Sequence, residues 1–160
     1  MSEAQGMEEQ LLETWRIHDR INHYLLDAIP EEALGSISAS KGRTVAEQIA
    51  HVHNVRLLWL GAAAPELMEG LAKIEKGQVA DREHLAAALT ASANAIEALL
   101  RKSLAGNGRI KGFKPHAVAF LGYLISHESH HRGQIVLTLK QASHPVDRKT
   151  AFGLWEWGTR

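Results

Sequence analysis

Apolar residues recur every three or four positions in four long stretches of the chain, and this spacing predicts amphipathic α-helices. The first predicted helix covers about residues 8–29 and ends before Pro30, because proline cannot continue a helix. The second begins at Thr44, with Glu47 three positions later in the spacing of a capping box, and ends at Gly61. This helix is apolar on almost every side, which predicts a central position in the fold.

Two further long helices and one short piece complete the pattern. Asp81 is a suitable N-cap for a third helix, which the glycines of residues 106–108 end. The fourth is expected from Pro115 to about Gln141, and a short helical piece is expected at 66–76. No strand-like alternation and no long repeat is present. The sequence therefore predicts an all-α four-helix bundle.

The chain has more apolar residues than the inward-facing sides of four helices can bury. Leu58 and Val55 extend the apolar surface of the second helix, and the tail, residues 144–160, carries the aromatic residues Phe152, Trp155 and Trp157. We expect the tail to pack against the bundle, because exposed aromatic residues would leave a large apolar patch. The surplus also predicts a homodimer, since a twofold contact is the commonest way to cover such a surface.

The length, composition and charge of the chain indicate which class of protein to expect. A length of 160 residues suits one domain, residues 1–160, and 45% hydrophobic with 22% charged residues is typical of a globular protein. Eighteen basic residues balance eighteen acidic ones without a basic cluster, so nucleic acid is not expected as a partner. No stretch predicts a membrane span, and the N-terminus, from Met1, lacks the features of a secretory signal. A cytoplasmic protein is expected.

Ten histidines and no cysteine favour a metal site built from nitrogen ligands alone. His127 and His131 are four positions apart on the fourth helix, so both rings project from one face and can reach one ion. Two ligands alone bind weakly. Gly133 follows closely in the middle of this helix, at a cost of about 1 kcal/mol relative to alanine, which predicts a close-packing role for it.

The second helix offers two candidates for a third ligand, His51 and His53. Hydrophobic periodicity places His53 nearer the middle of the most apolar arc and so favours it. Glu47, one turn before His51, and Asn54 are possible hydrogen-bond partners for a ligand at position 51. The periodicity alone does not decide for His51.

Three segments resemble the DinB superfamily of bacterial proteins. They are the string from His127 to Gln134, the string from Thr44 to His51, and the stretch from Asn22 to Pro30. The resemblance covers nearly the whole chain. It implies an up-down-down-up four-helix bundle in which His51, His127 and His131 bind a divalent ion. His53 is then expected to be a satisfied or peripheral histidine.

Other polar residues near these positions have two interpretations each. His130, beside a predicted ligand, is expected at the surface or near the site rather than as a ligand. His18 and Asn22 lie on the apolar stripe of the first helix, so they either line the site or hydrogen-bond inside the core. Arg132 binds either an anion or a carboxylate of a neighbouring helix.

Three imidazoles without a carboxylate leave an ion its full charge and open coordination positions, which is typical of catalytic sites. The superfamily resemblance implies either thiol transferases that use bacillithiol or mycothiol, or metal-dependent hydrolases. We expect a thiol-dependent S-transferase in stress or detoxification, acting on a small-molecule substrate; the alternatives are a hydrolase and a non-catalytic metal-binding stress protein or sensor. Zinc is the first choice of metal, with nickel, iron or manganese as alternatives.

Overall fold

The computed structural model describes residues 5–78 and 81–160, and the named secondary-structure elements in this part of the chain are all helical. Residues 1–4 lie outside the described part. The expectation about a secretory signal rests partly on these residues. The long helices are α1 (Met7–Asp27), α2 (Val45–Ala63), α3 (Arg82–Ala105) and α4 (Ala117–Gln141). Shorter elements are η1 (Glu31–Ala33), η2 (Pro65–Met68), α5 (Arg148–Gly153) and η3 (Trp157–Thr159).

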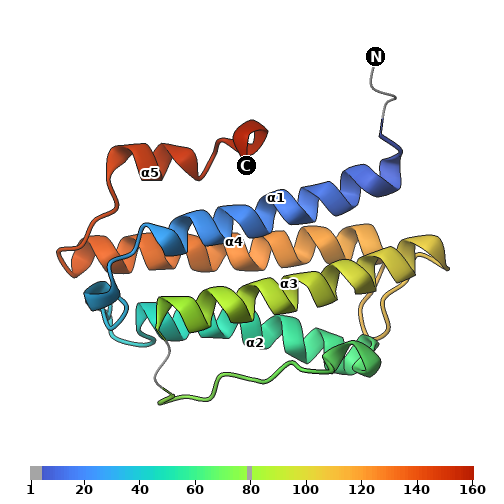
Figure 1. Ribbon diagram of the computed structural model, residues 1–160, viewed down its shortest axis with the longest axis horizontal. Helices are drawn as coiled ribbons and strands as arrows, with labels where there is room; N and C mark the ends of the chain where they lie inside the picture. Colours follow the sequence, from blue (N-terminus) through green and yellow to red (C-terminus); the bar gives the residue numbers. More distant parts are fainter. Residues whose placement is uncertain (1–4, 79–80) are drawn as a thin grey trace.

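The four long helices form the up-down-down-up bundle that was expected. Figure 1 shows α1 and α4 running in one direction and α2 and α3 in the other. Because α2 and α3 are parallel, the chain between them must return along the length of the bundle. It does so as an extended strap, residues 69–78, which lies beside α2 (Figure 1). None of the described helices is long and apolar enough to cross a membrane.

The helix starts follow the capping residues in the sequence. Thr44 and Glu47 form the predicted capping box, with each side chain bonded to the other's backbone nitrogen. Asp81 accepts a bond from the His84 nitrogen at 2.7 Å and so caps α3. Two boundaries were predicted wrongly. Helix α4 begins after His116, whose ring nitrogen caps it, and α2 continues past Gly61 to Ala63, because one exposed glycine does not end a helix whose other side is packed.

The predicted helical piece at 66–76 was also wrong over most of its length. Only Pro65–Met68 forms a turn of 3-10 helix. The strap after it is held instead by polar side chains of α2. Asn54 donates to the Ile74 carbonyl and accepts from the Ile74 nitrogen at 2.8 and 2.9 Å, and His53 Nε2 donates to the Ala72 carbonyl at 2.8 Å. These bonds satisfy the backbone without helix.

Two apolar clusters make up the core, and a polar layer separates them along the helices. One cluster takes Leu25 from α1 and Ile135 from α4, whereas the other takes Trp15 from α1 and Leu124 from α4. Between these positions, the helices contribute a different set of buried residues: His18, Asn22, Arg56, Ser92, Glu128 and His131. A buried polar layer at mid-height requires partners for every group in it.

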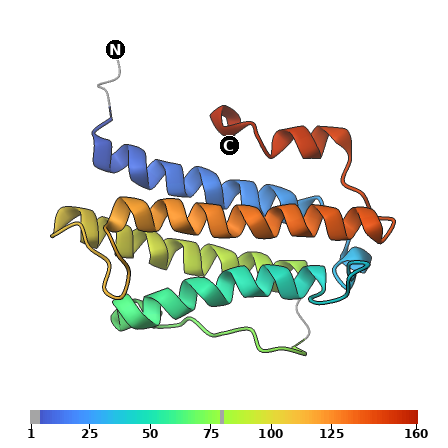
Figure 2. The same ribbon diagram turned by 180° about the vertical axis from the view of Figure 1, so that it is seen from behind.

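The tail packs against the bundle only in part. Leu154 and Val146 contact the core, and Gly153 lies so close to Tyr24 that a Cβ there would overlap the phenol oxygen. Phe152 and Trp155, however, are 58% and 81% exposed. The expectation that the bundle covers the tail aromatics therefore fails for these two. Figure 2 shows α5 lying outside the layer formed by α1 and α4.

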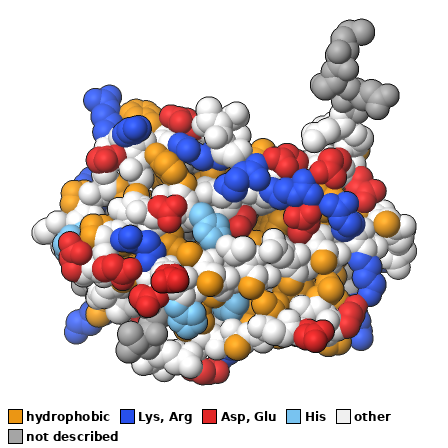
Figure 3. All heavy atoms as spheres, viewed as in Figure 1, with side chains coloured by type: hydrophobic (Ala, Val, Ile, Leu, Met, Phe, Trp, Pro, Cys, Tyr) orange, Lys and Arg blue, Asp and Glu red, His pale blue; other side chains and the backbone are white. Residues whose placement is uncertain are grey.

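Acidic and basic side chains are mixed over α1 on the face in Figure 3. Arg16 pairs with Glu9 and Glu97 at 2.6 Å, and Arg20 pairs with Glu13 at 2.6 Å. This face has no broad area of one sign, such as a phosphate backbone would need.

Candidate metal centre

His51, His127 and His131 meet between α2 and α4. One nitrogen from each ring can be chosen so that all three lie within 4.8 Å of one another. The ring centroids are 4.6 to 5.4 Å apart. His127 and His131 come together because they are one helical turn apart, and His51 reaches them because α2 packs beside α4. No other group of this kind occurs in residues 5–78 and 81–160.

Gln48 determines which nitrogen of His131 is available. Its side-chain oxygen lies 2.9 Å from His131 Nδ1. An amide oxygen only accepts hydrogen bonds, so Nδ1 carries the proton and Nε2 keeps its lone pair. This lone pair faces His127 Nε2 at 3.2 Å.

The spacing and charge state of these rings fit a divalent ion. Two nitrogens about 2.0 to 2.1 Å from a tetrahedral ion lie roughly 3.3 Å apart, close to the 3.2 Å between the two Nε2 atoms. Burial, assisted by Arg43 and the neighbouring rings, lowers the pKa of His51, and burial lowers the pKa of His127. It also lowers the pKa of His131 to about 4. The rings are therefore neutral near pH 7, as metal ligands must be.

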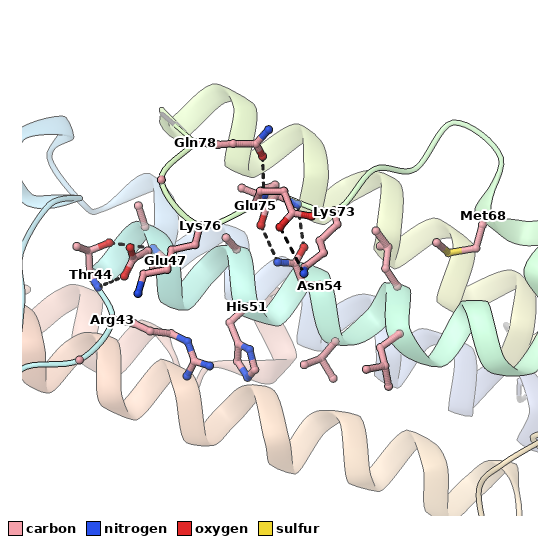
Figure 4. A pocket seen from close by; sticks show the side chains of 18 residues that line it. Arg43, Thr44, Glu47, His51, Asn54, Met68, Lys73, Glu75, Lys76 and Gln78 are labelled. Atoms are coloured by element: carbon pink, nitrogen blue, oxygen red, sulfur yellow. Dashed lines mark hydrogen bonds and ion pairs between the residues drawn. The ribbon is translucent and has the colours of Figure 1, made fainter.

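The centre opens on one side to a groove of about 1150 Å³. The groove lies along α2 and under the strap, and His51 and Arg43 are among its lining residues. Figure 4 shows both side chains pointing from the α2 side toward α4. A small molecule in this groove can contact His51.

A comparison with protein families identifies the bundle. The family model described as "DinB family" matches residues 1–155, which is nearly the whole chain. The chain belongs to the DinB family. A search among curated proteins finds no match.

In this DinB-family protein, the other candidate residues lie outside the cluster of three histidines. Glu47 lines the groove, but its carboxylate caps α2 by accepting from the Thr44 nitrogen. Asn54 holds the strap. His53 also contacts the strap and lies outside the cluster, while His130 is exposed with its ring 5.2 Å from that of His131. The predicted hydrogen bond from Glu47 to His51 is not observed in the described part of the chain, and Oε2 of Glu47 accepts from the Thr44 nitrogen instead.

His18 and Asn22 belong to a buried network centred on Glu128, and not to the groove. Glu128 accepts from His18 Nε2 at 2.7 Å, from Asn22 Nδ2 at 2.8 Å, and from Arg56 Nε and Nη2 at 2.7 and 2.9 Å. Arg132 donates to Asn22 Oδ1 at 2.6 Å and to His18 Nδ1 at 3.2 Å. The core interpretation of His18 and Asn22 is therefore the one that the structure supports.

Charge balance in the network depends on Arg56. Burial alone would raise the pKa of Glu128, but Arg56 and His18 outweigh it and hold the pKa well below its ordinary value. Burial lowers the pKa of His18, which stays neutral with its proton on Nε2, because Nδ1 accepts from Arg132. The ion pair between Arg56 and Glu128 is the electrostatic centre of the polar layer.

Two functional candidates were missed in the sequence: Gln48 and Arg43. Gln48 is a polar residue on an apolar helix, one turn before His51, and that signal was available. Arg43 precedes α2 in a loop, where periodicity carries no information. A further residue beside the cluster is Tyr123, which is 37% exposed and stacks on His127 with 6.2 Å between ring centroids.

The close-packing role predicted for Gly133 was wrong. Gly133 is exposed, and a Cβ built on it meets no atom within 4 Å. Nothing in the structure of the single chain requires glycine there.

Proposed function

We propose that this protein is a divalent-metal-dependent enzyme that joins a low-molecular-weight thiol to an electrophilic compound. His51, His127 and His131 hold the ion, with zinc as the first choice. The observation that carries the proposal is a cluster of three neutral nitrogen donors with no carboxylate among them, open to a groove. A divalent ion bound there supplies a positive charge that lowers the pKa of a thiol or water beside it.

The chain's own residues prepare the site for this chemistry. Gln48 orients His131 and fixes its proton on Nδ1, and Tyr123 stacks against His127 and covers one side of its ring. The groove admits substrate from the side of His51. Because the chain has no cysteine, the sulfur nucleophile must enter from solution, and the groove is wide enough for it.

Thiol transfer is tested with zinc-loaded protein, a panel of cysteine, glutathione, bacillithiol and mycothiol, and 1-chloro-2,4-dinitrobenzene as electrophile. In the reaction a carbon–sulfur bond forms, chloride leaves, and the thiol proton goes to solvent. We expect at least one thiol to react faster with wild type than with the His131→Ala variant. Equal rates for both proteins across the panel would overturn the proposal.

A hydrolase is the second candidate, because the Glu47 carboxylate lines the same groove and can accept a proton from water. Its signature is metal-dependent cleavage of 4-nitrophenyl esters without thiol. A metal-binding stress protein without turnover would show neither activity while still binding metal with His51, His127 and His131. The three candidates thus give different results in the same pair of assays.

We also propose a homodimer and a role in stress or detoxification. Leu58, Phe152 and Trp155 are all more than half exposed, which supports a further covering surface. Light scattering tests the dimer: a mass near the 17.6 kDa of one chain at micromolar concentration would contradict it.

A further inference from the structure

The groove beside the three histidines has two chemically different ends. Arg43 lines it just before α2 begins, and Val55 and Leu58 line it further along the same helix, with His51 between them. Figure 4 shows Arg43 and His51 pointing in the same direction, toward α4. A ligand centred at His51 therefore has a cation on one side and apolar side chains on the other.

Arg43 is a guanidinium without a partner. It is exposed and makes no hydrogen bond or ion pair within residues 5–78 and 81–160. The acidic residues of the groove have other partners, since Glu47 accepts from the Thr44 nitrogen and Glu75 pairs with Lys73 at 3.5 Å. Its charge also contributes to the lowered pKa values of His51, His127 and His131, so it acts on all three rings. A free guanidinium in such a place suits a carboxylate, which it can bind through two parallel hydrogen bonds.

Aromatic rings lie beside His127, on the other side of the three histidines from Arg43. Tyr123 stacks on His127, Trp59 lies edge-on to Tyr123 at 5.7 Å, and Phe113 lies 5.6 Å from Trp59. Because α2 and α4 are antiparallel, the end of α2 that carries Trp59 lies beside the start of α4 that carries Tyr123, away from Arg43 (Figure 1). Such a row of rings offers faces and edges for a flat apolar group.

We propose that the site takes an anionic substrate with a flat apolar body, whose carboxylate binds Arg43 and whose ring rests against Tyr123 and Trp59. The reacting atom then lies between these ends, at the three histidines. This inference rests on the proposed function for its chemistry, but the two ends of the site are features of the chain alone.

The test compares three thiols on cobalt-loaded protein, whose visible spectrum reports sulfur binding. They are 3-mercapto-3-phenylpropionate, whose sulfur lies between an acid and a ring, benzyl mercaptan, with the ring alone, and 3-mercaptopropionate, with the acid alone. We expect the first to bind at least tenfold more tightly than either of the others, since hydrogen bonds to charged groups are stronger than those between neutral groups. The Arg43→Ala variant should lose at least tenfold in affinity for both acids and none for benzyl mercaptan.

Arg43→Lys should restore part of the affinity, because lysine keeps the charge but not the paired hydrogen bonds. Lys140→Ala, which removes an exposed positive charge from the last turn of α4, is the matched control and should bind all three thiols like wild type. Metal content and circular dichroism of each variant confirm that the site is intact. Equal affinities of wild type for benzyl mercaptan and for 3-mercapto-3-phenylpropionate would overturn the inference. An equal loss of affinity for both thiols in Arg43→Ala would overturn it as well.

A failure of the proposed function gives a different result. If none of the thiols changes the cobalt spectrum, thiol transfer is wrong, and calorimetry of the zinc protein with 3-phenylpropionate decides the inference. Binding that is lost in Arg43→Ala supports the anionic site, and absence of binding to wild type overturns it.

Discussion

Two clusters of polar side chains lie at mid-height in this bundle, and they are built from neighbouring residues. His127 and His131 face His51 of α2, whereas Glu128 and Arg132, each the next residue along α4, face the interior and bond to Asn22 of α1. In the interior cluster opposite charges meet and the hydrogen-bond donors find acceptors. In the groove cluster three histidine rings, each with a nitrogen that can bind a metal, meet without a carboxylate. Nδ1 of His127 is buried and has no hydrogen-bond partner among the described residues.

The difference separates a structural use of buried polarity from a functional one. A buried ion pair with full hydrogen bonding holds helices in one register and leaves no capacity for a ligand. A group of neutral donors with unused lone pairs has that capacity and adds little to the stability of the metal-free chain. Mutations that act on stability and on metal binding should therefore separate between the two clusters.

The largest effect on stability is expected from Glu128→Gln. The variant leaves Arg56 fully buried with a weakened partner, which should reduce the free energy of unfolding by about 3 to 5 kcal/mol in urea denaturation. Because the pKa of Glu128 is lowered on folding, its contribution is present at neutral pH and is lost as pH falls below the ordinary value of 4.5. Glu13→Gln, at a partly exposed pair with Arg20, is the control and should cost below about 1 kcal/mol. A similar small cost for Glu128→Gln would contradict the structural role of the network.

The largest effect on metal binding is expected from His127→Ala and His131→Ala. Each should abolish stoichiometric binding, as measured by elemental analysis after metal loading, while the metal-free variants stay folded. His53→Ala is the matched control, because His53 is a buried histidine of α2 that contacts the strap. Equal loss of metal in the His53 variant would show that the ligand from α2 has been chosen wrongly.

A smaller effect should follow from Gln48→Leu, which keeps the size of the side chain but removes the acceptor for His131 Nδ1. Loss of such a support typically weakens metal affinity about 10 to 100-fold. Competition with a chromophoric zinc chelator measures this change. Gln134→Leu, the same replacement at an exposed position of α4, should leave the affinity unchanged, and an equal loss there would remove the special role of Gln48.

The fold could be predicted well from the sequence because the helices of a bundle depend on patterns among neighbouring residues. The capping box at Thr44 and the N-cap at Asp81 require only neighbouring residues, and both are present as predicted. The prediction of a helix in the strap failed because the side chains of Asn54 and His53 form hydrogen bonds with its backbone, and both residues are about twenty positions away. Contacts of this range leave no periodic signal.

The site was predictable only in part, for a related reason. Periodicity measures burial, and it favoured His53, which is indeed the more buried of the two histidines of α2. His51, which is partly exposed, is the histidine of α2 that meets His127 and His131. Only the family resemblance pointed to His51. Arg43 lies in a loop and gave no such signal, whereas Gln48 was detectable as a polar residue one turn before His51 on an apolar helix.

The smallest predicted effect concerns the outer side of α4, which belongs to neither cluster. Gly133 is exposed in the middle of this helix, and an added Cβ meets nothing within 4 Å. Gly133→Ala should therefore stabilise the protein by about 0.5 to 1 kcal/mol, since alanine loses less backbone entropy in a helix. Gly61→Ala, at an exposed glycine of α2 with the same free space, is the control and should behave alike. Thermal unfolding measures both, and metal content should stay at the wild-type level. If Gly133→Ala destabilises the protein while Gly61→Ala stabilises it, a surface from a second chain must pack on Gly133, and the mass of that variant by light scattering should then fall toward that of a single chain.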